Sequence, residues 1–365
     1  MNRNLRGTYA LVDLKRYLNN LNIARKLSKS YITPVIKANG YGHGAIELAR
    51  FTLEHSDIRI FCVATFEEGV TLRDGLGEAA EIIVLGFVDE YFFNELITNN
   101  LLINIYDDEI AFRFNKYLEK KGMKYPVSIK IDTGMNRLGF DVSMNFRDFN
   151  EKYPNLIPKV LMSHLSSPDS DLEYTSWQID RFSSVVERAK KIFPHIKSSL
   201  FNSSALLSFE NSFDYSRPGI LTYGFVKSDY DIGIKPVMKI FSKIIHVKYL
   251  DKNESVGYNR TYITGKKTIL GVLPIGYADG YNRLLSNKGF VYVDGYKCPI
   301  IGRICMDMTM IDISDLPEGK WYKEVEILGD NIRADEMAKM CNTISYEILT
   351  SISPRIPRIY EGIDE

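Results

Sequence analysis

The residues best suited to chemistry lie in one short run, PVIKANGYGHG, from Pro34 to Gly44. An apolar stretch ends there in Lys37, and a glycine-rich loop with Tyr41 leads to a segment that is predicted to be a helix from Ala45. A lysine at a strand end is a poor structural choice, but its amine is a good Schiff-base nucleophile. Barrel enzymes often build their sites from such strand ends. The residues alone leave open a surface lysine before a turn.

A second candidate is Arg137, which follows the run Lys130-Ile131-Asp132 and lies between two glycines. An arginine in such a loop can orient a carboxylate with two parallel hydrogen bonds. The alternative is a structural arginine paired with Asp132. Lys130 alternates with Asp132 along a predicted strand, so both point to the same side. A buried lysine there needs a partner or must lose its charge.

Two further regions carry polar groups behind apolar runs. His164 follows a predicted strand. A histidine there is either a core residue whose polar atoms are hydrogen-bonded or a residue that stacks on a planar cofactor. Hydroxyl and backbone N–H groups that suit a phosphate occur near a predicted helix start, in the stretches with Ser204, Arg217, Gly219 and Ile220. Either stretch could equally be a capped helix N-terminus.

The last third of the chain adds three residues in polar loops: Tyr258, Tyr277 and Met306. Tyrosines in exposed loops usually serve packing. Together with a reactive lysine in a preceding barrel, they suggest a composite site that a second domain closes.

These side chains need elements that position them. Strand-like and helix-like runs alternate over the first two-thirds of the sequence, which predicts a parallel α/β fold. The candidates follow one predicted strand after another, which favours a (β/α)8 TIM-like barrel with its site at the carboxyl ends of the strands. Residues 1–233 are therefore predicted to form this barrel.

The pattern changes near residue 234, where β-rich runs separated by turns begin. Asp294-Gly295 between two such runs predicts a hairpin, and the run from Ile240 to Leu250 predicts a strand. Helices are expected only at 335–341 and 345–351. Residues 234–365 are therefore predicted to form a mainly-β domain.

Composition excludes several classes of function. The 46 Lys and Arg residues balance the 46 Asp and Glu residues, so neither a nucleic acid nor a membrane surface is an expected partner. Four cysteines without a CxxC pair predict reduced thiols and no metal site. The N-terminal residues lack a secretion signal, which predicts a cytoplasmic protein.

Six motifs together identify a relationship: VIKANGYGHG, DTGMNRLGF, RPGILTYG, VGYNRTY, LPIGYADGY and GRICMDM. In this order they resemble the motifs of the bacterial alanine racemase family, whose members are pyridoxal-phosphate enzymes of fold-type III. The resemblance covers the chain from about Tyr9 to Tyr360. The resemblance implies an eight-stranded barrel, a C-terminal β-domain and a head-to-tail homodimer with shared active sites. It also implies an isomerase that interconverts L-alanine and D-alanine and supplies D-alanine for peptidoglycan.

The resemblance implies two catalytic residues on opposite faces of the cofactor. Lys37 matches the lysine that binds the cofactor covalently and later acts as a base. Tyr258, from the partner subunit, matches the acid/base on the other face, as a two-base racemisation requires. Arg217 matches the arginine that faces the pyridine nitrogen and, since it cannot easily give up a proton, keeps that nitrogen unprotonated.

The other roles that the resemblance implies are binding roles. The phosphate is held by Tyr41, Ser204, Gly219 and Ile220, and His164 lies near the cofactor ring. Arg137 and Met306 bind the substrate carboxylate, Tyr277 narrows the entrance, and Lys130 matches a lysine that is often carbamylated. Two positions depart from the family pattern. Pro354 stands where a phosphate-binding tyrosine is usual, and Leu200 stands where a histidine is usual behind Arg217.

Three alternatives remain at this point. A racemase of serine, lysine or ornithine would use the same chemical core, and Pro354 would widen the entrance for a larger side chain. A fold-type III decarboxylase would be expected to carry a GGG phosphate loop, which the sequence lacks. A pyridoxal-phosphate carrier built on the barrel would have no use for Tyr258 or Met306.

Overall fold

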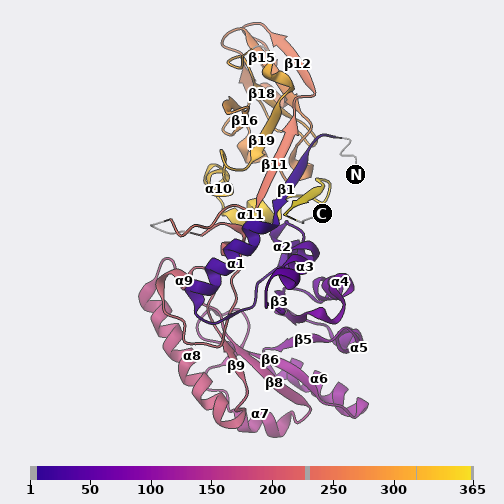
Figure 1. Ribbon diagram of the computed structural model, residues 1–365, viewed down its shortest axis with the longest axis vertical. Helices are drawn as coiled ribbons and strands as arrows, with labels where there is room; N and C mark the ends of the chain where they lie inside the picture. The colour runs from indigo at the N-terminus through magenta and orange to yellow at the C-terminus, as the bar shows by residue number, and fades with distance from the viewer. Residues whose placement is uncertain (1–5, 227–230, 318, 363–365) are drawn as a thin grey trace. The chain divides into compact units, whose positions relative to one another are not determined.

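The computed structural model describes residues 6–226, 231–317 and 319–362 (Figure 1). Residues 1–5, part of the stretch that predicted no secretion signal, lie outside the described residues. The chain forms two compact units. The barrel unit contains Leu18–Gly40 and Ala45–Ile234, and the β unit contains Met1–Tyr17, Tyr41–Gly44 and Lys235–Glu365. No helix in the described residues is long and apolar enough to cross a membrane.

The barrel unit is a ring of parallel strands in the order β2-β10-β9-β8-β6-β5-β4-β3. The ring closes beyond β2, where Val35 bridges Cys62 and the Ile36 N–H donates to the Cys62 carbonyl at 2.9 Å. Its strands β3, β4 and β5 are nearly continuous apolar runs because both of their faces are buried. The predicted (β/α)8 barrel is confirmed. The strands are β2 (Tyr31–Ile32), β3 (Ile60–Val63), β4 (Glu81–Val84), β5 (Leu101–Ile105), β6 (Tyr125–Asp132), β7 (Phe140–Asp141, beside β6), β8 (Leu156–Met162), β9 (Lys197–Ser199) and β10 (Tyr215–Ser216).

Amphipathic helices follow the strands of the barrel. The longest, α8, turns its buried residues, among them Phe182 and Val185, toward the core. The short segment α2 differs from all the others because its backbone is left-handed. The helices are α1 (Leu14–Ser28, which begins in the β unit), α2 (Lys37–Tyr41), α3 (Ala45–His55), α4 (Phe66–Leu76), α5 (Phe93–Thr98), α6 (Asp108–Lys121), α7 (Phe146–Lys152), α8 (Leu172–Ile192) and α9 (Ala205–Ser208), with the 3-10 turns η1 (Gly77–Ala79), η2 (Glu90–Phe92) and η3 (Ile220–Tyr223).

The β unit contains a six-stranded sheet, β17-β16-β19-β11-β1-β20, and a three-stranded sheet, β12-β15-β18. The predicted mainly-β domain is confirmed, with its hairpin at Asp294 and Gly295, which both have positive φ. The elements are β1 (Tyr9–Asp13), β11 (Met238–Lys243), β12 (His246–Leu250), β13 (Ser255–Val256), β14 (Tyr262–Ile263), β15 (Thr268–Leu273), β16 (Phe290–Val293), β17 (Tyr296–Pro299), β18 (Thr309–Asp312), β19 (Glu324–Leu328), β20 (Arg358–Glu361), α10 (Ala334–Cys341), α11 (Ser345–Thr350), η4 (Tyr258–Arg260), η5 (Tyr277–Asp279), η6 (Arg283–Leu285) and η7 (Lys320–Tyr322).

Two details differ from the sequence-based expectation. The predicted barrel domain 1–233 includes β1, but this strand pairs with β11 and β20 in the β unit and buries Ala10 and Val12 there. The run from Ile240 to Leu250 forms two strands rather than one, because the chain leaves one sheet after Lys243 and enters the other at His246.

Candidate active site

Lys37 lies directly after the residues that close the barrel ring. Its side chain is partly buried. Burial and the positive charge of Arg137 hold the pKa of Lys37 below its usual value, whereas the nearby carboxylate of Glu68 acts in the opposite direction. A larger share of the amine is therefore neutral than in an exposed lysine, as a nucleophile or a base requires.

Lys130 on β6 and His164 after β8 share this environment. Burial, followed by the charges of Arg217 and Arg137, holds the pKa of Lys130 well below its usual value. The pKa of His164 is also well below its usual value, because of burial and then the charges of Lys130 and Arg217. His164 is therefore neutral at pH 7. The carboxyl ends of the barrel strands thus gather two arginines, Arg137 and Arg217, beside the basic side chains of Lys37 and Lys130, and this set suits an anionic ligand.

Arg217 is 4% exposed and comes directly after β10. Its guanidinium donates to the Ser199 hydroxyl and the Ser163 carbonyl, and it lies 3.5 Å from Nδ1 of His164. Since Arg217 can only donate, the neutral His164 ring accepts at Nδ1. Burial lowers the pKa of Arg217 to about 10, so this side chain is cationic at pH 7.

Leu200, the position singled out behind Arg217, is fully buried. The side chain that bonds the guanidinium is that of Ser199, one residue earlier. The Ser199 hydroxyl therefore supports Arg217 in place of the histidine that is usual in the family at position 200. The residue type at Ser199 carried no signal in the sequence, because serine is common at the end of a strand.

Asp132 does not pair with Arg137 among the described residues. One of its carboxylate oxygens instead accepts the backbone N–H groups of Gly134 at 2.8 Å and Asn136 at 3.1 Å. This bonding folds the loop after β6 and leaves the exposed guanidinium of Arg137 available. The alternative of a structural Arg137–Asp132 pair is therefore wrong.

The loop that carries Gly219 and Ile220 is held by Ser203. The buried Ser203 hydroxyl accepts the N–H groups of Gly219 at 2.9 Å and Leu221 at 3.2 Å. Ser204 precedes α9 and makes no side-chain cap, so its partly exposed hydroxyl is available to a ligand. The structure thus brings Ser204 and the loop together, and it adds Ser203, whose only sequence signal was its place beside Ser204.

Gln178 on α8 is a supporting residue that the sequence analysis missed. Its fully buried side-chain amide lies within bonding distance of the Thr133 hydroxyl at 3.5 Å and the His164 carbonyl at 3.4 Å, and its oxygen accepts the Ser166 N–H at 3.0 Å. Thr133 in turn bonds the Ser163 hydroxyl at 2.8 Å. One side chain therefore ties the loops after β6 and β8 together.

Three predicted site residues of the β unit are exposed: Tyr258 by 67%, Met306 by 53% and Tyr277 by 42%. The Tyr277 N–H donates to the Cys305 carbonyl at 3.0 Å, which joins the loops of Tyr277 and Met306. A Cβ on Gly257 would lie 3.5 Å from the Arg303 nitrogen, so the Tyr258 loop borders the same region. Exposed apolar side chains gathered in this way are typical of an interaction surface.

Tyr41 belongs to the β unit, where it is 5% exposed. Its ring centroid lies 5.9 Å from that of Tyr346 on α11. Arg358 donates to the Gly42 carbonyl at 3.0 Å and to the Ser353 carbonyl at 2.7 Å. The segment that carries Tyr41 is therefore joined to the segment that carries Pro354.

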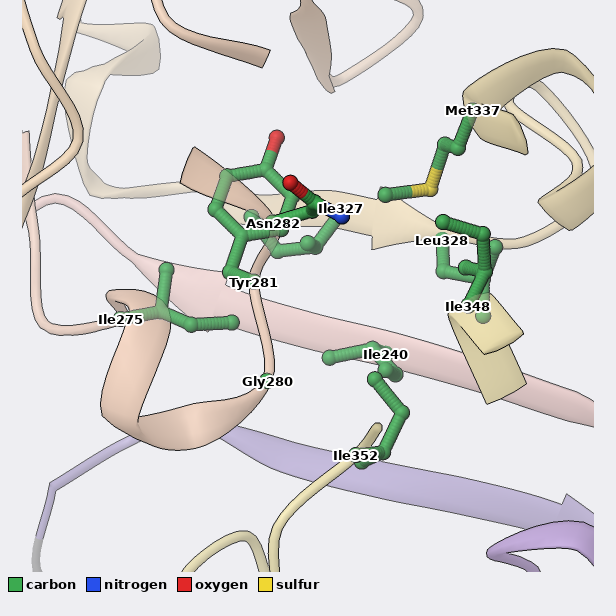
Figure 2. Close-up of a pocket in the computed structure, with 10 residues that line it drawn as sticks. All are labelled: Ile240, Ile275, Gly280, Tyr281, Asn282, Ile327, Leu328, Met337, Ile348 and Ile352. Carbon is green, nitrogen blue, oxygen red and sulfur yellow. The ribbon is translucent and has the colours of Figure 1, made fainter. Parts of the chain in front are cut away.

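The β unit also contains a small cavity (Figure 2). Its volume is about 10 Å³, and isoleucine side chains such as Ile240, Ile348 and Ile352 line it. The Tyr281 hydroxyl is buried without a partner among the described residues, and burial raises its pKa. The cavity has room for about one water molecule and is too small for an amino acid.

Comparisons with known proteins agree with this geometry. The family model described as alanine racemase, N-terminal domain, matches residues 12–227, and the model of the C-terminal domain matches residues 237–360. Alanine racemase 1 of Clostridium acetobutylicum is 35% identical over 99% of this chain and 97% of its own length. The alanine racemase of Halothermothrix orenii is 36% identical over 99% of both chains.

Solved structures give the same result. The alanine racemase of Clostridium difficile 630 has a TM-score of 0.89 at 31% identity and covers 97% of this chain and 95% of its own. The alanine racemase of Bartonella henselae, solved with covalently bound pyridoxal phosphate, has a TM-score of 0.88 at 30% identity. The match covers 97% of this chain and 99% of the Bartonella chain.

Proposed function

The chain belongs to the alanine racemase family, and we propose that it interconverts L-alanine and D-alanine with pyridoxal phosphate as its cofactor. One observation carries this proposal. Lys37, with a lowered pKa, lies among the charges of Arg137, Lys130 and Arg217 at the carboxyl ends of the barrel strands.

The residues present fit the cofactor. Pyridoxal phosphate carries a phosphate dianion, an aldehyde, a phenolic oxygen and a ring nitrogen, and the substrate adds a carboxylate. Lys37 would hold the aldehyde, and the Ser204 hydroxyl with the loop of Gly219 and Ile220 would hold the phosphate. Tyr41 is proposed as a second phosphate hydroxyl. The two arginines and two lysines of this cluster, with no ion pair to Arg137 among the described residues, suit this set of anions.

Racemisation needs a proton removed from one face of the α-carbon and returned to the other. When bound, pyridoxal phosphate would supply an electron sink for the α-carbon. Lys37, whose burial lowers its pKa, is the proposed base on one face. Tyr258 of the partner subunit is the proposed acid/base on the other face, and its exposure allows it to reach a second copy.

Arg217 and His164 set the protonation state around the ring. Arg217 would present only N–H donors to the ring nitrogen of the cofactor, which would therefore stay unprotonated. His164 is neutral and is proposed to lie against the ring. Both groups are held by the Ser199, Ser163 and Gln178 contacts described above.

Arg137 is proposed to bind the substrate carboxylate, together with the backbone N–H of Met306. Tyr277 would narrow the entrance. Lys130 is proposed to be carbamylated: its neutral amine adds CO₂ and releases one proton, so that a neutral group becomes an anion beside Arg137. The low pKa of Lys130 supports this step because only the neutral amine reacts. Mass spectrometry of the Lys130 peptide under CO₂, compared with carbonate-free buffer, tests it.

The exposed surface of Tyr258, Tyr277 and Met306 supports a head-to-tail homodimer whose sites are shared. Balanced charge supports an enzyme without a nucleic-acid partner. Its free cysteines, of which Cys62, Cys298 and Cys341 are buried, support a cytoplasmic location. The proposed role is to supply D-alanine for peptidoglycan.

Chiral analysis of the products from purified protein, pyridoxal phosphate and a panel of L-amino acids is the test. We expect D-alanine to dominate and Lys37→Ala to form none. If D-serine, D-lysine or D-ornithine dominates, the reaction type stands but the substrate is a different amino acid. Pro354 favours this alternative because it stands where the family usually has a tyrosine, and it would widen the entrance. Release of CO₂ without a D-product would reject racemisation in favour of decarboxylation.

A further inference from the structure

The backbone after Lys37 is unusual. Ala38, Asn39 and Gly40 have φ of 51°, 52° and 62°, and Tyr41 continues with 51°. Each non-glycine residue in this left-handed conformation costs about 1–2 kcal/mol. Such strain persists only where the surroundings hold the chain in place.

Glu68 is the side chain that holds the start of this turn. Its Oε1 accepts the Ala38 N–H at 2.6 Å, the first peptide N–H after Lys37. Its Oε2 accepts the N–H groups of Ala64 at 2.7 Å and Thr65 at 3.3 Å. Both oxygens are thus used, and short bonds to a carboxylate are among the stronger hydrogen bonds in proteins.

The rest of the turn is tied within the same unit. The Gly40 N–H donates to the Ile36 carbonyl at 2.8 Å, and the Asn39 side chain accepts the Ala45 N–H at 3.0 Å. Glu68 reaches the turn from α4, 30 residues further along the chain than Ala38. It also belongs to the capping box of α4, in which the Thr65 hydroxyl accepts the Glu68 N–H.

We propose that Glu68 is a positioning residue for Lys37: its carboxylate joins the left-handed turn to the N-terminus of α4 and so aims the Lys37 amine. This inference rests on the proposed function, in which Lys37 takes the cofactor aldehyde. Glu68 also acts on the amine electrostatically. The charged or titratable groups that face Lys37 are Arg137, Glu68 and His164.

Glu68→Gln tests the proposal because glutamine keeps the size but has one acceptor oxygen. It cannot accept from both Ala38 and the start of α4. Two controls are matched to it. Thr65→Ala removes the other half of the capping box, and Glu67→Gln removes a charge from the exposed neighbouring residue.

The first readout is capture of pyridoxal phosphate by the cofactor-free full chain, trapped on Lys37 by borohydride and followed by peptide mass. We expect Glu68→Gln to slow capture about tenfold or more, as for loss of one charge-assisted hydrogen bond. The second readout is the pH midpoint at which an amine-specific reagent labels Lys37 without cofactor. We expect this midpoint to fall, because the charge that raised the pKa of Lys37 is gone.

Both changes in Glu68→Gln, with neither in the two controls, support the proposal. Wild-type capture in Glu68→Gln, an unmoved midpoint, or the same changes in Thr65→Ala would overturn it. Should Glu68→Gln not fold, amide exchange in the wild type decides: slow exchange of the exposed Ala38 N–H supports the bond, and fast exchange rejects it. If the wild-type chain captures no cofactor on Lys37, the proposed function fails instead.

Discussion

At the residue scale, the site depends on charges that the fold brings together without enough acids to neutralise them. Asp132 and Glu68 are the acids that act on Lys130 and Lys37, and both already accept backbone N–H groups. Burial, and then the positive charges of Arg217 and Arg137 at Lys130 and of Arg137 at Lys37, therefore lower the pKa values of the two lysines. This arrangement costs stability in the free protein and favours an anionic ligand.

A pH prediction follows for Lys130. Its folded pKa is depressed, so between that pKa and about 10.4, the usual value, the unfolded chain binds more protons. The free energy of unfolding of cofactor-free protein in carbonate-free buffer should therefore rise with pH across this window. In Lys130→Met the rise should be smaller and the stability at lower pH higher, as measured by denaturant unfolding at several pH values.

Lys124→Met is the control for this prediction, because Lys124 is exposed near the start of the same strand. It should keep the wild-type slope. Equal slopes in the wild type and Lys130→Met would contradict a depressed pKa at Lys130.

The Pro354 position gives a second prediction at this scale. Pro354→Tyr restores a hydroxyl on a segment that Arg358 joins to the Tyr41 segment. A hydrogen bond to the charged phosphate contributes about 1.5–3 kcal/mol, so the Kd for pyridoxal phosphate should fall about tenfold or more. A larger side chain should also narrow the range of amino acids accepted, measured as kcat/KM across a panel.

Pro354→Phe separates the two effects. It should narrow the substrate range without tightening cofactor binding. Equal cofactor affinity in the Tyr and Phe variants would show that the hydroxyl does not reach the phosphate.

At the scale of the elements, parallel strands deliver residues from distant parts of the chain to one end of the barrel. Lys130, His164 and Arg217 come from β6, β8 and β10. The loops that follow the strands need their own support, which α8 supplies through Gln178. Helices in this fold therefore position the site as well as cover the strands.

Gln178→Ala should lower the free energy of unfolding by about 1–3 kcal/mol, because buried polar groups at Ser166 and His164 lose their partner. Cofactor affinity should fall as well, since the loops after β6 and β8 lose their common tie. Denaturant unfolding and cofactor titration measure the two effects. Glu187→Ala, at an exposed position of the same helix, should stay within about 0.5 kcal/mol of the wild type. An unchanged cofactor affinity in Gln178→Ala would contradict the positioning role.

At the scale of the whole molecule, the proposal divides each active site between two copies of the chain. Lys37 belongs to the barrel unit and Tyr258 to the β unit. In a head-to-tail dimer, each barrel would meet the β unit of the other copy.

Mixing two inactive variants tests this arrangement. In a hybrid dimer of Lys37→Ala and Tyr258→Phe, one site carries both changes and the other carries none. Statistical exchange of subunits should therefore restore about a quarter of the wild-type activity. If each site lies within one chain, the mixture will stay as inactive as its components. Sedimentation of the mixture provides the control that dimers have formed.

Much of the fold was predictable because its signals are local. Apolar runs that alternate with helical segments predicted the barrel, and Asp294-Gly295 predicted a hairpin that the structure contains. The strand β1 was not separable from the barrel by such signals, because its partners β11 and β20 lie more than 200 residues away in the chain. Strand pairing over such distances leaves no local pattern.

By itself, the sequence determined the type of chemistry, the family and the order of the two architectures, because motif residues and hydrophobic periodicity are properties of short segments. Tertiary structure alone decided how those residues are held. Ser199 rather than Leu200 supports Arg217, Gln178 ties two loops, and Glu68 braces the strained turn after Lys37. These roles depend on hydrogen bonds between distant segments, whose residue types are ordinary until folding brings their partners within about 3 Å.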